Sequence, residues 1–549
     1  MLVNLQSMTH PTNPQKTPKT PKTPKAQQTQ QQAGQGLAGQ DKPADNADRA
    51  GQPDQERILR MMATAQVQLR SLAPTLIPLA AAFEDAGHDL YLVGGSVRDA
   101  LLGELGMDLD FTTDARPDAV TNILNTCTDN VWDTGIDYGT VSASRNGWQI
   151  EITTFRADQY DGVSRNPIVQ FGDTLEGDLV RRDFTVNAMA VRLHGDGTQD
   201  FCDPLGGIND LEMGVLDTPQ TPSVSFHDDP LRMIRACRFV SKLGFTLAPR
   251  VTAAITEMSG EITRITAERI QAELDKLMLG AYPWDGIDLL CQTGLADHIF
   301  PEIPAMAMPP DPKLPHKDVY THSLTVLKQA CDLEPGDPDL VLRWAALLHD
   351  IGKVPTRAPK PGGGVTFYQH EIVGARMVRK RLRALKYSRQ MINDISQLVY
   401  LHLRIHGYGD GEWTDSAVRR YVTDAGPLLD RLNLLVRADC TTAREWKRKQ
   451  QQALVDNLEA RIAELREKED LEAIRPDLDG NEIMQILGLN PGPEVGKAWA
   501  YLKNLRIEQG PMEHDEAVAA LQNWWAGHAG STERAGSVER TGSAERQEE

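Results

Sequence analysis

The sequence predicts an α+β protein in which a small mixed-sheet unit precedes an all-α remainder. Between Asp89 and Val191, short runs of β-type residues alternate with turns and helical stretches, a pattern typical of a mixed sheet with helices. From about Pro230 onward, apolar residues recur at helical spacing almost throughout. The predicted strands are residues 90–93, 109–112, 140–143, 149–155 and 187–192, and the clearest helices are 230–243, 267–279, 341–348 and 444–475.

Length and composition set limits on structure and location. The 549 residues suffice for roughly three or four domains, and 40% of them are apolar, so large cores can form. No apolar run is long enough to span a membrane, and the N-terminus lacks the order of charged, apolar and small residues that marks a signal peptide. We therefore expect a cytoplasmic protein with no membrane partner.

Both ends of the chain are predicted to be disordered. Residues 1–56 contain no Phe, Trp or Tyr and combine a Lys-Thr-Pro repeat with a glutamine-rich run. Such a segment cannot bury enough surface to offset the entropy lost on ordering. Residues 529–549 repeat the pattern Ser-x-Glu-Arg-x-Gly, which is too short and polar to form a solenoid.

Cysteine spacing and charge exclude further classes. The six cysteines lie far apart with no Cys-x-x-Cys pair, which argues against a zinc ribbon and a disulfide scaffold and favours a reducing compartment. The 58 Lys and Arg against 77 Asp and Glu give a net charge of −19. An acidic protein must use local basic patches for any contact with nucleic acid.

A glycine turn and three carboxylates form the first candidate site. Gly94 and Gly95 end a predicted strand just before a helix, where backbone amides can approach a phosphate, although for these two glycines alone a tight turn is the more common explanation. Asp108 and Asp110 alternate along the next strand and so point to one side, where two like charges need a cation. Glu151 on a later strand is a third hard ligand for Mg²⁺ or simply an exposed strand residue.

Arginines and acids follow at two further places. Arg181 and Arg182 stand beside Asp183 at the start of an apolar run, and their guanidinium groups suit a triphosphate or a structural ion pair. Asp229 and Arg232 open a predicted helix and, at a spacing of i and i+3, are expected to share one face of it. They are either a surface ion pair or a pair that reads the edge of a base.

These motifs together carry a family resemblance. GGSVRD, DLD, EITTFR, RRDFTVNAMA and DDPLRMIRACRF, in this order over roughly residues 70–290, resemble the signature of class II tRNA nucleotidyltransferases and bacterial poly(A) polymerases. The resemblance implies a nucleotidyltransferase head followed by helical neck, body and tail segments that hold the tRNA acceptor arm. It implies CTP and ATP as substrates and Mg²⁺ as cofactor.

The resemblance also assigns roles to residues. It implies catalytic and Mg²⁺-binding roles for Asp108 and Asp110, with Glu151 as a third catalytic carboxylate. The implied nucleotide-binding residues are Gly94, Gly95, Ser96, Arg98, Arg182, Asp183, Asn187, Asp229, Arg232 and Arg235. A carboxylate and a guanidinium match the donor and acceptor order of C and A, whereas G and U present the opposite order.

The head motifs favour CCA addition over poly(A) addition. Residues 134–141 and the linker 156–167 resemble the CCA-adding pattern, and a Gly-Arg-Arg-Phe-like stretch typical of poly(A) polymerases is missing. We therefore expect untemplated addition of C, C and A to tRNA. The alternatives are a poly(A) or A-adding polymerase and an HD phosphohydrolase whose head binds RNA.

Histidines and acids form a second candidate site in the helical part. His322, the adjacent His349 and Asp350, and Asp439 lie in helical contexts, where burial of charge requires metal or hydrogen bonds. Their spacing resembles the HD family of metal-dependent phosphohydrolases, which implies a second divalent metal. His370 and His402, with His406 as a substitute, are candidates to complete the set. Some relatives with this domain remove 2′,3′-cyclic or 3′ phosphates from RNA, and the domain is alternatively a scaffold.

The predicted domain boundaries follow from these assignments. A basic cluster at Arg444, Lys447, Arg448 and Lys449 precedes tail motifs that resemble those of HD-bearing CCA enzymes, and it is a candidate RNA contact or a solvated helix face. DNA is not expected as a partner. The segments are a disordered tail at 1–56, the head at 57–200, the neck at 201–290, the HD domain at 291–443, a helical tail at 444–528 and a disordered tail at 529–549.

Overall fold

The computed structural model describes residues 53–135, 139–156, 171–309, 318–405, 413–442, 444–471 and 474–541. The chain divides into two compact units, Met1–His298 and Ile299–Glu549. Nearly all of the predicted N-terminal disordered tail, parts of the CCA-adding pattern at 136–138 and 157–167, and His406 lie outside the described residues.

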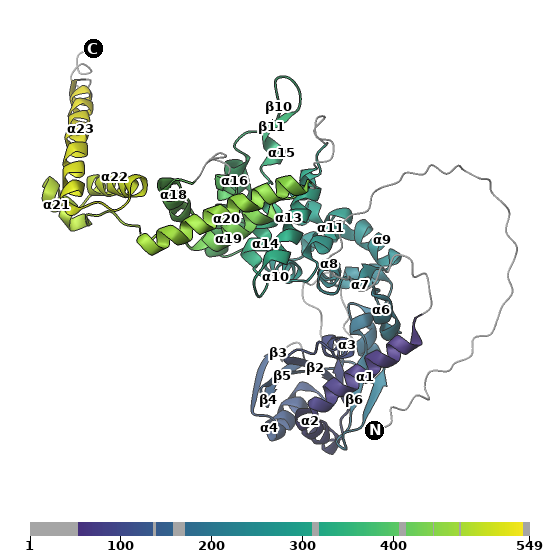
Figure 1. Ribbon diagram of the computed structural model, residues 1–549. Helices are drawn as coiled ribbons and strands as arrows, with labels where there is room; N and C mark the ends of the chain where they lie inside the picture. Colours follow the sequence, from purple (N-terminus) through teal and green to yellow (C-terminus); the bar gives the residue numbers. More distant parts are fainter. Residues whose placement is uncertain are drawn as a thin grey trace, which may run out of the picture. The chain divides into compact units, whose positions relative to one another are not determined.

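A seven-stranded mixed sheet forms the centre of the first unit, with strand order β3-β4-β5-β2-β1-β6-β7 (Figure 1). Strand β2 pairs with β5 in parallel, and the other neighbouring pairs are antiparallel. The strands are β1 Leu90–Val93, β2 Asp108–Thr113, β3 Asn130–Gly135, β4 Thr140–Arg145, β5 Trp148–Thr154, β6 Ala190–Leu193 and β7 Gln199–Cys202. The predicted mixed sheet is thereby confirmed.

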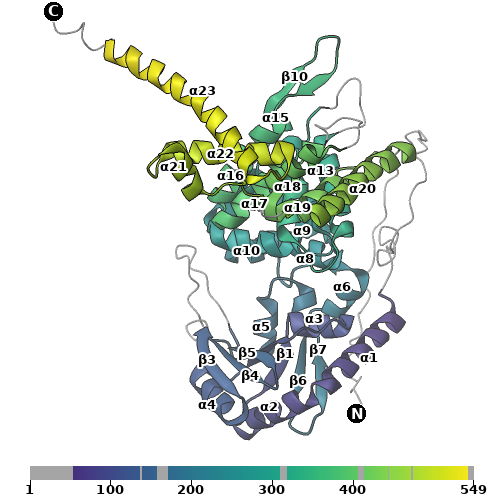
Figure 2. The same ribbon diagram turned by 60° about the vertical axis from the view of Figure 1, so that its left-hand side comes forward.

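Helices cover this sheet and bury its apolar positions. Figure 2 shows α1, α2 and α4 beside the strands, and α1 packs on α3 while α2 packs on α4. Their bounds are α1 Gln55–Ser71, α2 Ala73–Asp85, α3 Gly95–Leu102, α4 Pro117–Cys127 and α5 Leu175–Val180. Leu109 and Phe111 are buried in the core, so the alternating residues of β2 point away from it.

The remaining helices of this unit pack around α8. Helix α8, Leu231–Leu243, contacts α10, Ala267–Met278, and α11, Pro283–Gln292. A Cβ atom on Gly286 would lie 2.9 Å from the backbone oxygen of Cys237, so this glycine lets α11 approach α8 closely. The other helices are α6 Gly207–Met213, α7 Pro222–Asp228 and α9 Pro249–Met258, and β8 Val215–Leu216 pairs with β9 Thr246–Leu247.

Among its described residues, the second unit is helical, as predicted, apart from one small hairpin formed by β10, Arg357–Pro359, and β11, Val365–Phe367. Trp344 is fully buried in its core and stacks on Phe300. The helices that build the core region are α13 Val319–Leu333, α14 Leu340–Leu348, α15 Lys353–Thr356, α16 His370–Ala384, α17 Arg389–Leu401, α18 Asp415–Ala425, α19 Leu429–Ala438 and α20 Glu445–Lys468.

The C-terminal helices depart from the sequence prediction in one respect. They are α21 Gly480–Leu487, α22 Pro493–Gln509 and α23 His514–Thr541. Helix α23 continues through Thr541, so it includes residues 529–541 of the segment for which the sequence predicts disorder. The repeat there contains Ala, Glu and Arg, which are strong helix formers, together with Gly, Ser and Thr, which are weaker ones.

No helix among the described residues is long and apolar enough to cross a membrane.

A histidine bridge ties α2 to the edge of the sheet. His194 lies 2.9 Å from a carboxylate oxygen of Glu84 through Nδ1 and 3.0 Å from one of Asp200 through Nε2. Burial opposes the charged ring, but the bonds to Asp200 and Glu84 raise the pKa of His194 above its usual value. Protonated His194 therefore stabilises the folded head.

The His194 bridge predicts a pH-dependent stability. A histidine whose pKa is higher in the folded protein than in the unfolded chain stabilises the fold most at pH values below its unfolded pKa of about 6.5. This contribution disappears as the pH rises through the pKa of the folded protein. Relative to a His194→Gln variant, the parent should gain up to about 1 kcal/mol at about pH 6 and less at about pH 8.5. Urea unfolding at both pH values measures this difference, and an equal difference at both would contradict it.

Candidate functional site

The glycine turn at the end of β1 faces an arginine. Gly94 has φ +67°, and a Cβ atom there would lie 3.0 Å from Nη1 of Arg182. The positive φ favours glycine at this position. After the turn, Arg98 of α3 is buried, pairs with Asp99 at 2.7 Å and donates to Oδ1 of Asn187 at 2.5 Å.

Asp108, Asp110 and Glu151 lie on two adjacent strands. Asp110 on β2 is the register partner of Glu151 on β5. Ser96 connects α3 to β2, because its Oγ accepts from the backbone N–H of Asp110 at 2.9 Å and donates to the backbone oxygen of Asp108 at 3.4 Å. Burial and the charge of Glu151 raise the pKa of Asp110, and Arg182 opposes that rise.

The ligand atoms of Asp108, Asp110 and Glu151 do not all lie within 4.8 Å of one another. Among the described residues, the groups of three or more candidate metal ligands whose ligand atoms lie within 4.8 Å of one another are both in the second unit. Asp110 nevertheless lies beside two further acids, since Glu151 and Asp108 both raise its pKa. Hard oxygen ligands in such a cluster suit a small divalent cation.

The arginine pair binds a different acid from the one expected. Asp178 is fully buried and accepts from Arg181 at 2.7 Å and from Arg182 at 3.0 Å. Although burial opposes ionisation, these two arginines lower the pKa of Asp178. The pattern Arg-Arg-Asp suggested neighbours in sequence, but a helix brings i and i+4 together, so Asp178 at the end of α5 takes the role.

Asp183 instead anchors helix α8 to the site. Its carboxylate accepts from Nε of Arg235 at 2.9 Å and from the amide of Asn187 at 3.0 Å. Burial favours the neutral acid, but Arg235 and Asn187 hold the pKa of Asp183 well below its usual range. Arg235, Asp183 and Asn187 therefore form one fixed network beside the glycine turn.

These groups line a cavity of about 460 Å³. Sequence reasoning identified most of its lining but missed Arg238, Phe239, Lys242 and Lys276. Burial and the neighbouring Arg235 lower the pKa of Arg238 to about 10. The missed signal was the spacing of Arg235, Arg238 and Lys242 on α8, which places three cations on one helix face. The predicted residues in the lining are Gly94, Gly95, Arg98, Asp110, Arg182, Asp183, Asn187 and Arg235.

Contrary to the prediction, Asp229 and Arg232 do not share a helix face. Asp229 precedes α8 in extended conformation, accepts from the backbone N–H of Leu231 at 3.1 Å and pairs with Arg269 at 3.0 Å. Arg232 donates to Oγ of Ser225 at 2.8 Å and to the backbone oxygen of Arg181 at 2.7 Å. Pro230 explains the difference, because the residue before a proline favours extended conformation.

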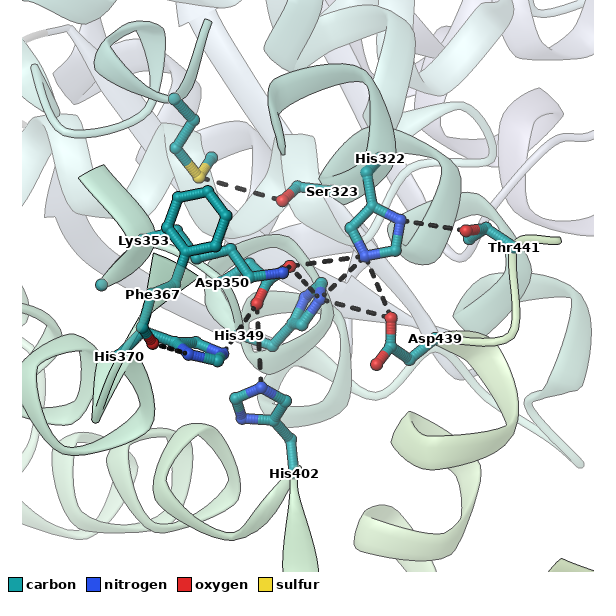
Figure 3. A network of polar contacts seen from close by, with 12 residues as sticks. His322, Ser323, His349, Asp350, Lys353, Phe367, His370, His402, Asp439 and Thr441 are labelled. Atoms are coloured by element: carbon teal, nitrogen blue, oxygen red, sulfur yellow. Dashed lines mark hydrogen bonds and ion pairs between the residues drawn. The ribbon is translucent and has the colours of Figure 1, made fainter. Parts of the chain in front are cut away.

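The second candidate site gathers the predicted histidines and acids of the second unit (Figure 3). Two groups have ligand atoms within 4.8 Å of one another: His322, His349 and Asp439, and Asp350, His370 and His402. Asp350 connects them, since its carboxylate lies 3.3 Å from Nε2 of His349 and 3.3 Å from Nε2 of His370. His349, Asp350 and His402 are almost completely buried.

Each histidine is oriented by its other ring nitrogen. Nδ1 of His349 lies 2.8 Å from the backbone oxygen of Ala346. Nδ1 of His370 lies 2.8 Å from the backbone oxygen of Phe367, and Nδ1 of His402 lies 2.7 Å from that of Val399. These carbonyls accept a hydrogen bond when Nδ1 carries the ring proton, so Nε2 can carry the lone pair that binds a metal. Nε2 of His370 and of His402 is buried with no hydrogen-bond partner among the described residues, as expected for metal ligands.

The charges of this site also favour a cation. Burial alone would lower the pKa of His349, but Asp350 and Asp439 raise it to about 10. Burial and the charge on His349 lower the pKa of His402 to about 3. The buried carboxylate of Asp350 and the half-buried carboxylate of Asp439 thus favour a positive charge between them, while His402 stays neutral as a metal ligand must.

A cavity of about 120 Å³ adjoins this site, and its lining includes His322, Asp350, Lys353 and Arg357. Lys353 donates to Asp350 at 2.5 Å. Cations beside candidate metal ligands can bind a phosphate. The basic cluster at the start of α20 is less distinctive, since Lys449 pairs with Glu445 at 2.9 Å.

Three protein families match segments of the chain. The Poly A polymerase head domain matches residues 90–217, the probable RNA and SrmB-binding site of polymerase A matches 244–306, and the HD domain matches 319–444.

Curated relatives extend this similarity. An A-adding tRNA nucleotidyltransferase of Deinococcus radiodurans is 34% identical over 441 residues, which is 79% of this chain and 95% of that protein. A CCA-adding enzyme of Levilactobacillus brevis is 41% identical over 219 residues, 40% of this chain and 53% of that protein. The chain therefore aligns with about half the length of the latter.

Solved structures share the fold. The CCA-adding enzyme of Bacillus stearothermophilus in complex with CTP has 25% identity and a TM-score of 0.55, covering 84% of this chain and 99% of that chain. The Thermotoga maritima CCA-adding enzyme complexed with tRNA has 18% identity and a TM-score of 0.53, covering 83% of this chain and 96% of that chain. At 18% identity the second match shows the fold alone.

Proposed function

The chain belongs to the family of CCA-adding and A-adding tRNA nucleotidyltransferases, and from this premise we propose that it adds C, C and A to the tRNA 3′ end. The substrates are CTP, ATP and a tRNA bound through its acceptor arm. Selection of each nucleotide needs no nucleic-acid template, because protein side chains read the base.

The cation-lined cavity beside Asp110 carries this proposal. Arg98, Arg182, Arg235, Arg238, Lys242 and Lys276 line one space together with Asp110. A triphosphate needs this density of cations, and arginine forks match its oxygens. The Gly94 turn lets the same phosphates approach the backbone at the start of α3.

Carboxylates beside the cavity are the proposed metal ligands. Asp108 and Asp110, with Glu151 as the third catalytic acid, would hold Mg²⁺, which lowers the pKa of the attacking 3′ hydroxyl and neutralises the charge on the transferred phosphate. The cations of the cavity orient the triphosphate so that pyrophosphate leaves in line with the attack. Asp183 keeps Arg235 in place, and Asp178 does the same for Arg182.

Addition assays with single nucleotides test the proposal. A tRNA that lacks its CCA end should be extended by C residues with CTP alone and completed only when ATP is also present. Neither UTP nor GTP should be incorporated. Extension of the same RNA by a long run of A would contradict CCA addition and indicate a poly(A) polymerase.

A-only addition is the second candidate, because the relative aligned over 79% of the chain is an A-adding enzyme. Such an enzyme would ignore CTP and extend only a tRNA that already ends in CC. The same assay separates the two candidates when it is run on RNAs with and without the two C residues.

Asp229 and Arg232 are the proposed base-reading residues, and the incoming base would replace Arg269 as partner of the Asp229 carboxylate. Asp229→Asn keeps an oxygen for the Leu231 N–H but loses an acceptor. One good bidentate contact is worth about 1–3 kcal/mol of discrimination. UTP or GTP should therefore compete about tenfold better than in the parent, while turnover with saturating CTP falls less than in an Asp110 variant.

The matched control for base reading is Arg269→Gln, which removes the ion-pair partner of Asp229 but leaves the carboxylate in place. It should keep the parent selectivity. Competition assays on tRNA lacking CCA measure both variants. Unchanged exclusion of UTP and GTP in both Asp229→Asn and Arg232→Gln would show that base choice lies elsewhere.

We also propose that the HD site holds a divalent metal and hydrolyses phosphate esters at RNA ends. The converging Nε2 atoms of His322, His349, His370 and His402 support metal binding, and Lys353 and Arg357 in the adjoining cavity suit a substrate phosphate. Removal of a 2′,3′-cyclic or 3′ phosphate would restore the hydroxyl that the head uses as nucleophile.

A further inference from the structure

Helix α16 has one buried face and one cationic face. The buried side consists of His370, Gly374, Ala375, Val378 and Leu382, and α16 packs on α17. The opposite side carries Arg376, Arg379, Lys380 and Arg383, which are exposed apart from the half-buried Arg379. At 100° per residue these four side chains fall within about a third of the helix circumference. We call these four residues the cationic face.

The cationic face is not neutralised by the protein itself. Within the described part of the chain, none of its four residues takes part in an ion pair. Arg381 on another side of the same helix shows the contrast, since it binds Glu302 at 2.8 Å through Nε and at 3.0 Å through Nη2. In a chain of net charge −19, unneutralised cations at adjacent positions raise the local potential and attract a polyanion.

The turn after α16 extends the charge beyond the helix. Lys386 has φ +66°, and the backbone N–H of Tyr387 donates to the oxygen of Leu382 at 3.0 Å, which is the hydrogen bond of a Schellman motif. Tyr387 is buried against Trp344 and fixes this turn. Lys386 and Arg389 are exposed on either side of it, so they prolong the cationic surface in a fixed position.

The residue composition of this face indicates which class of partner it binds: a membrane, a protein or a nucleic acid. A membrane-binding helix inserts its apolar side into lipid, but the apolar side of α16 is buried against its own unit. A protein interface usually centres on exposed aromatic or aliphatic residues, and none of the large exposed hydrophobic residues of the described chain lies on α16. A surface of arginine and lysine alone is suited to the phosphates of a nucleic-acid backbone.

We propose that the cationic face of α16 binds the phosphate backbone of RNA. The choice of RNA rests on the proposed function. From Arg376 to Arg383 the face extends about 10 Å at about 1.5 Å per residue, enough for contacts to successive phosphates. It lies outside residues 244–306, which match the RNA-binding family. Helix α16 begins at His370 of the HD site, which lies on the buried side of the helix and not on the cationic face, so this face is a surface separate from that site.

Binding of tRNA lacking its CCA end, measured without nucleotides over a range of salt, tests the proposal. The variant Arg376→Gln, Lys380→Gln, Arg383→Gln removes three charges and retains residues of similar helix propensity. Its affinity should fall at least about tenfold at low salt, and the slope of log K against log salt should become less steep by about 2 to 3.

The control variant Arg404→Gln, Lys468→Gln, Lys497→Gln removes the same charge from residues that are paired with acids. It should retain the parent affinity and slope. An unchanged affinity in the α16 variant, or an equal loss in the control, overturns the proposal and leaves the face to another partner, such as an acidic protein. A parent that binds RNA through α16 but adds no C or A refutes the proposed function alone.

Discussion

Replacement of Asp108 or Asp110 by Ala should abolish nucleotide addition while the protein stays folded. The Asp110 side chain makes no hydrogen bond to the described residues, so the fold of the head does not depend on such a bond. The backbone N–H of Asp110 donates to Oγ of Ser96. In the proposed function these carboxylates would hold the divalent metal that stabilises the charge on the transferred phosphate. Groups that stabilise the transition state of phosphoryl transfer contribute roughly 10³- to 10⁵-fold, so turnover should fall by about 10³-fold or more.

The measurement is single-turnover addition of CTP to tRNA lacking CCA, with unfolding curves to show that each variant is folded. Asp118→Ala is a suitable control, since it removes an exposed carboxylate from α4. That variant should add nucleotides at the parent rate. Near-normal turnover of Asp110→Ala with Mg²⁺ would mean that the metal assignment is wrong.

Disruption of the HD site should remove hydrolysis without affecting addition. Asp350 lies within 3.8 Å of Nε2 of His322, His349, His370 and His402. His349→Ala combined with Asp350→Ala removes the centre of the ligand set and should eliminate both bound divalent metal and hydrolysis of 2′,3′-cyclic AMP. Addition of C and A should continue, because the proposed addition site belongs to the other unit.

A milder variant guards against misfolding, since both residues are buried. Asp350→Asn preserves volume and should still lose metal, measured by elemental analysis of the purified protein. Asp337→Asn, at an exposed position, should lose neither metal nor hydrolysis. Parent-level hydrolysis in a folded Asp350→Asn protein would exclude a catalytic HD site, and retained metal would exclude Asp350 as a ligand.

The sequence predicted those elements whose periodicity is unambiguous. The runs at β1, β2, β4 and β5 and the amphipathic helices α8 and α10 agree with the structure. Strand β7, Gln199–Cys202, was missed because it is short and polar and gains its partners only at the sheet edge. The hairpin β10-β11 was missed for a related reason, since its glycine-rich loop resembles a linker.

The structure brings many of the predicted site residues together, but their side-chain partners differ from those that the sequence suggested. The motif spacing identified Asp110, Arg182 and Asp183 as members of one site, and all three line the same cavity. It did not reveal that Arg182 binds Asp178, nor that Arg269 holds Asp229. The pairing of Arg269 with Asp229 depends on how helices pack, which local sequence does not encode. The pairing of Arg182 with Asp178 is local, at a spacing of i and i+4, but it required the short helix at Leu175–Val180 to be predicted.

The parallel pairing of β2 with β5 has a consequence for the order of folding. Thr112 and Thr153, which are bonded across this pair, are 41 residues apart in sequence, so the loop between the strands must close before they meet. A growing chain that ends before Trp148 contains the glycine turn, Asp108 and Asp110 but lacks the neighbouring strand. During synthesis β2 then has an open edge, and the head carboxylates meet Glu151 only after β5 has emerged.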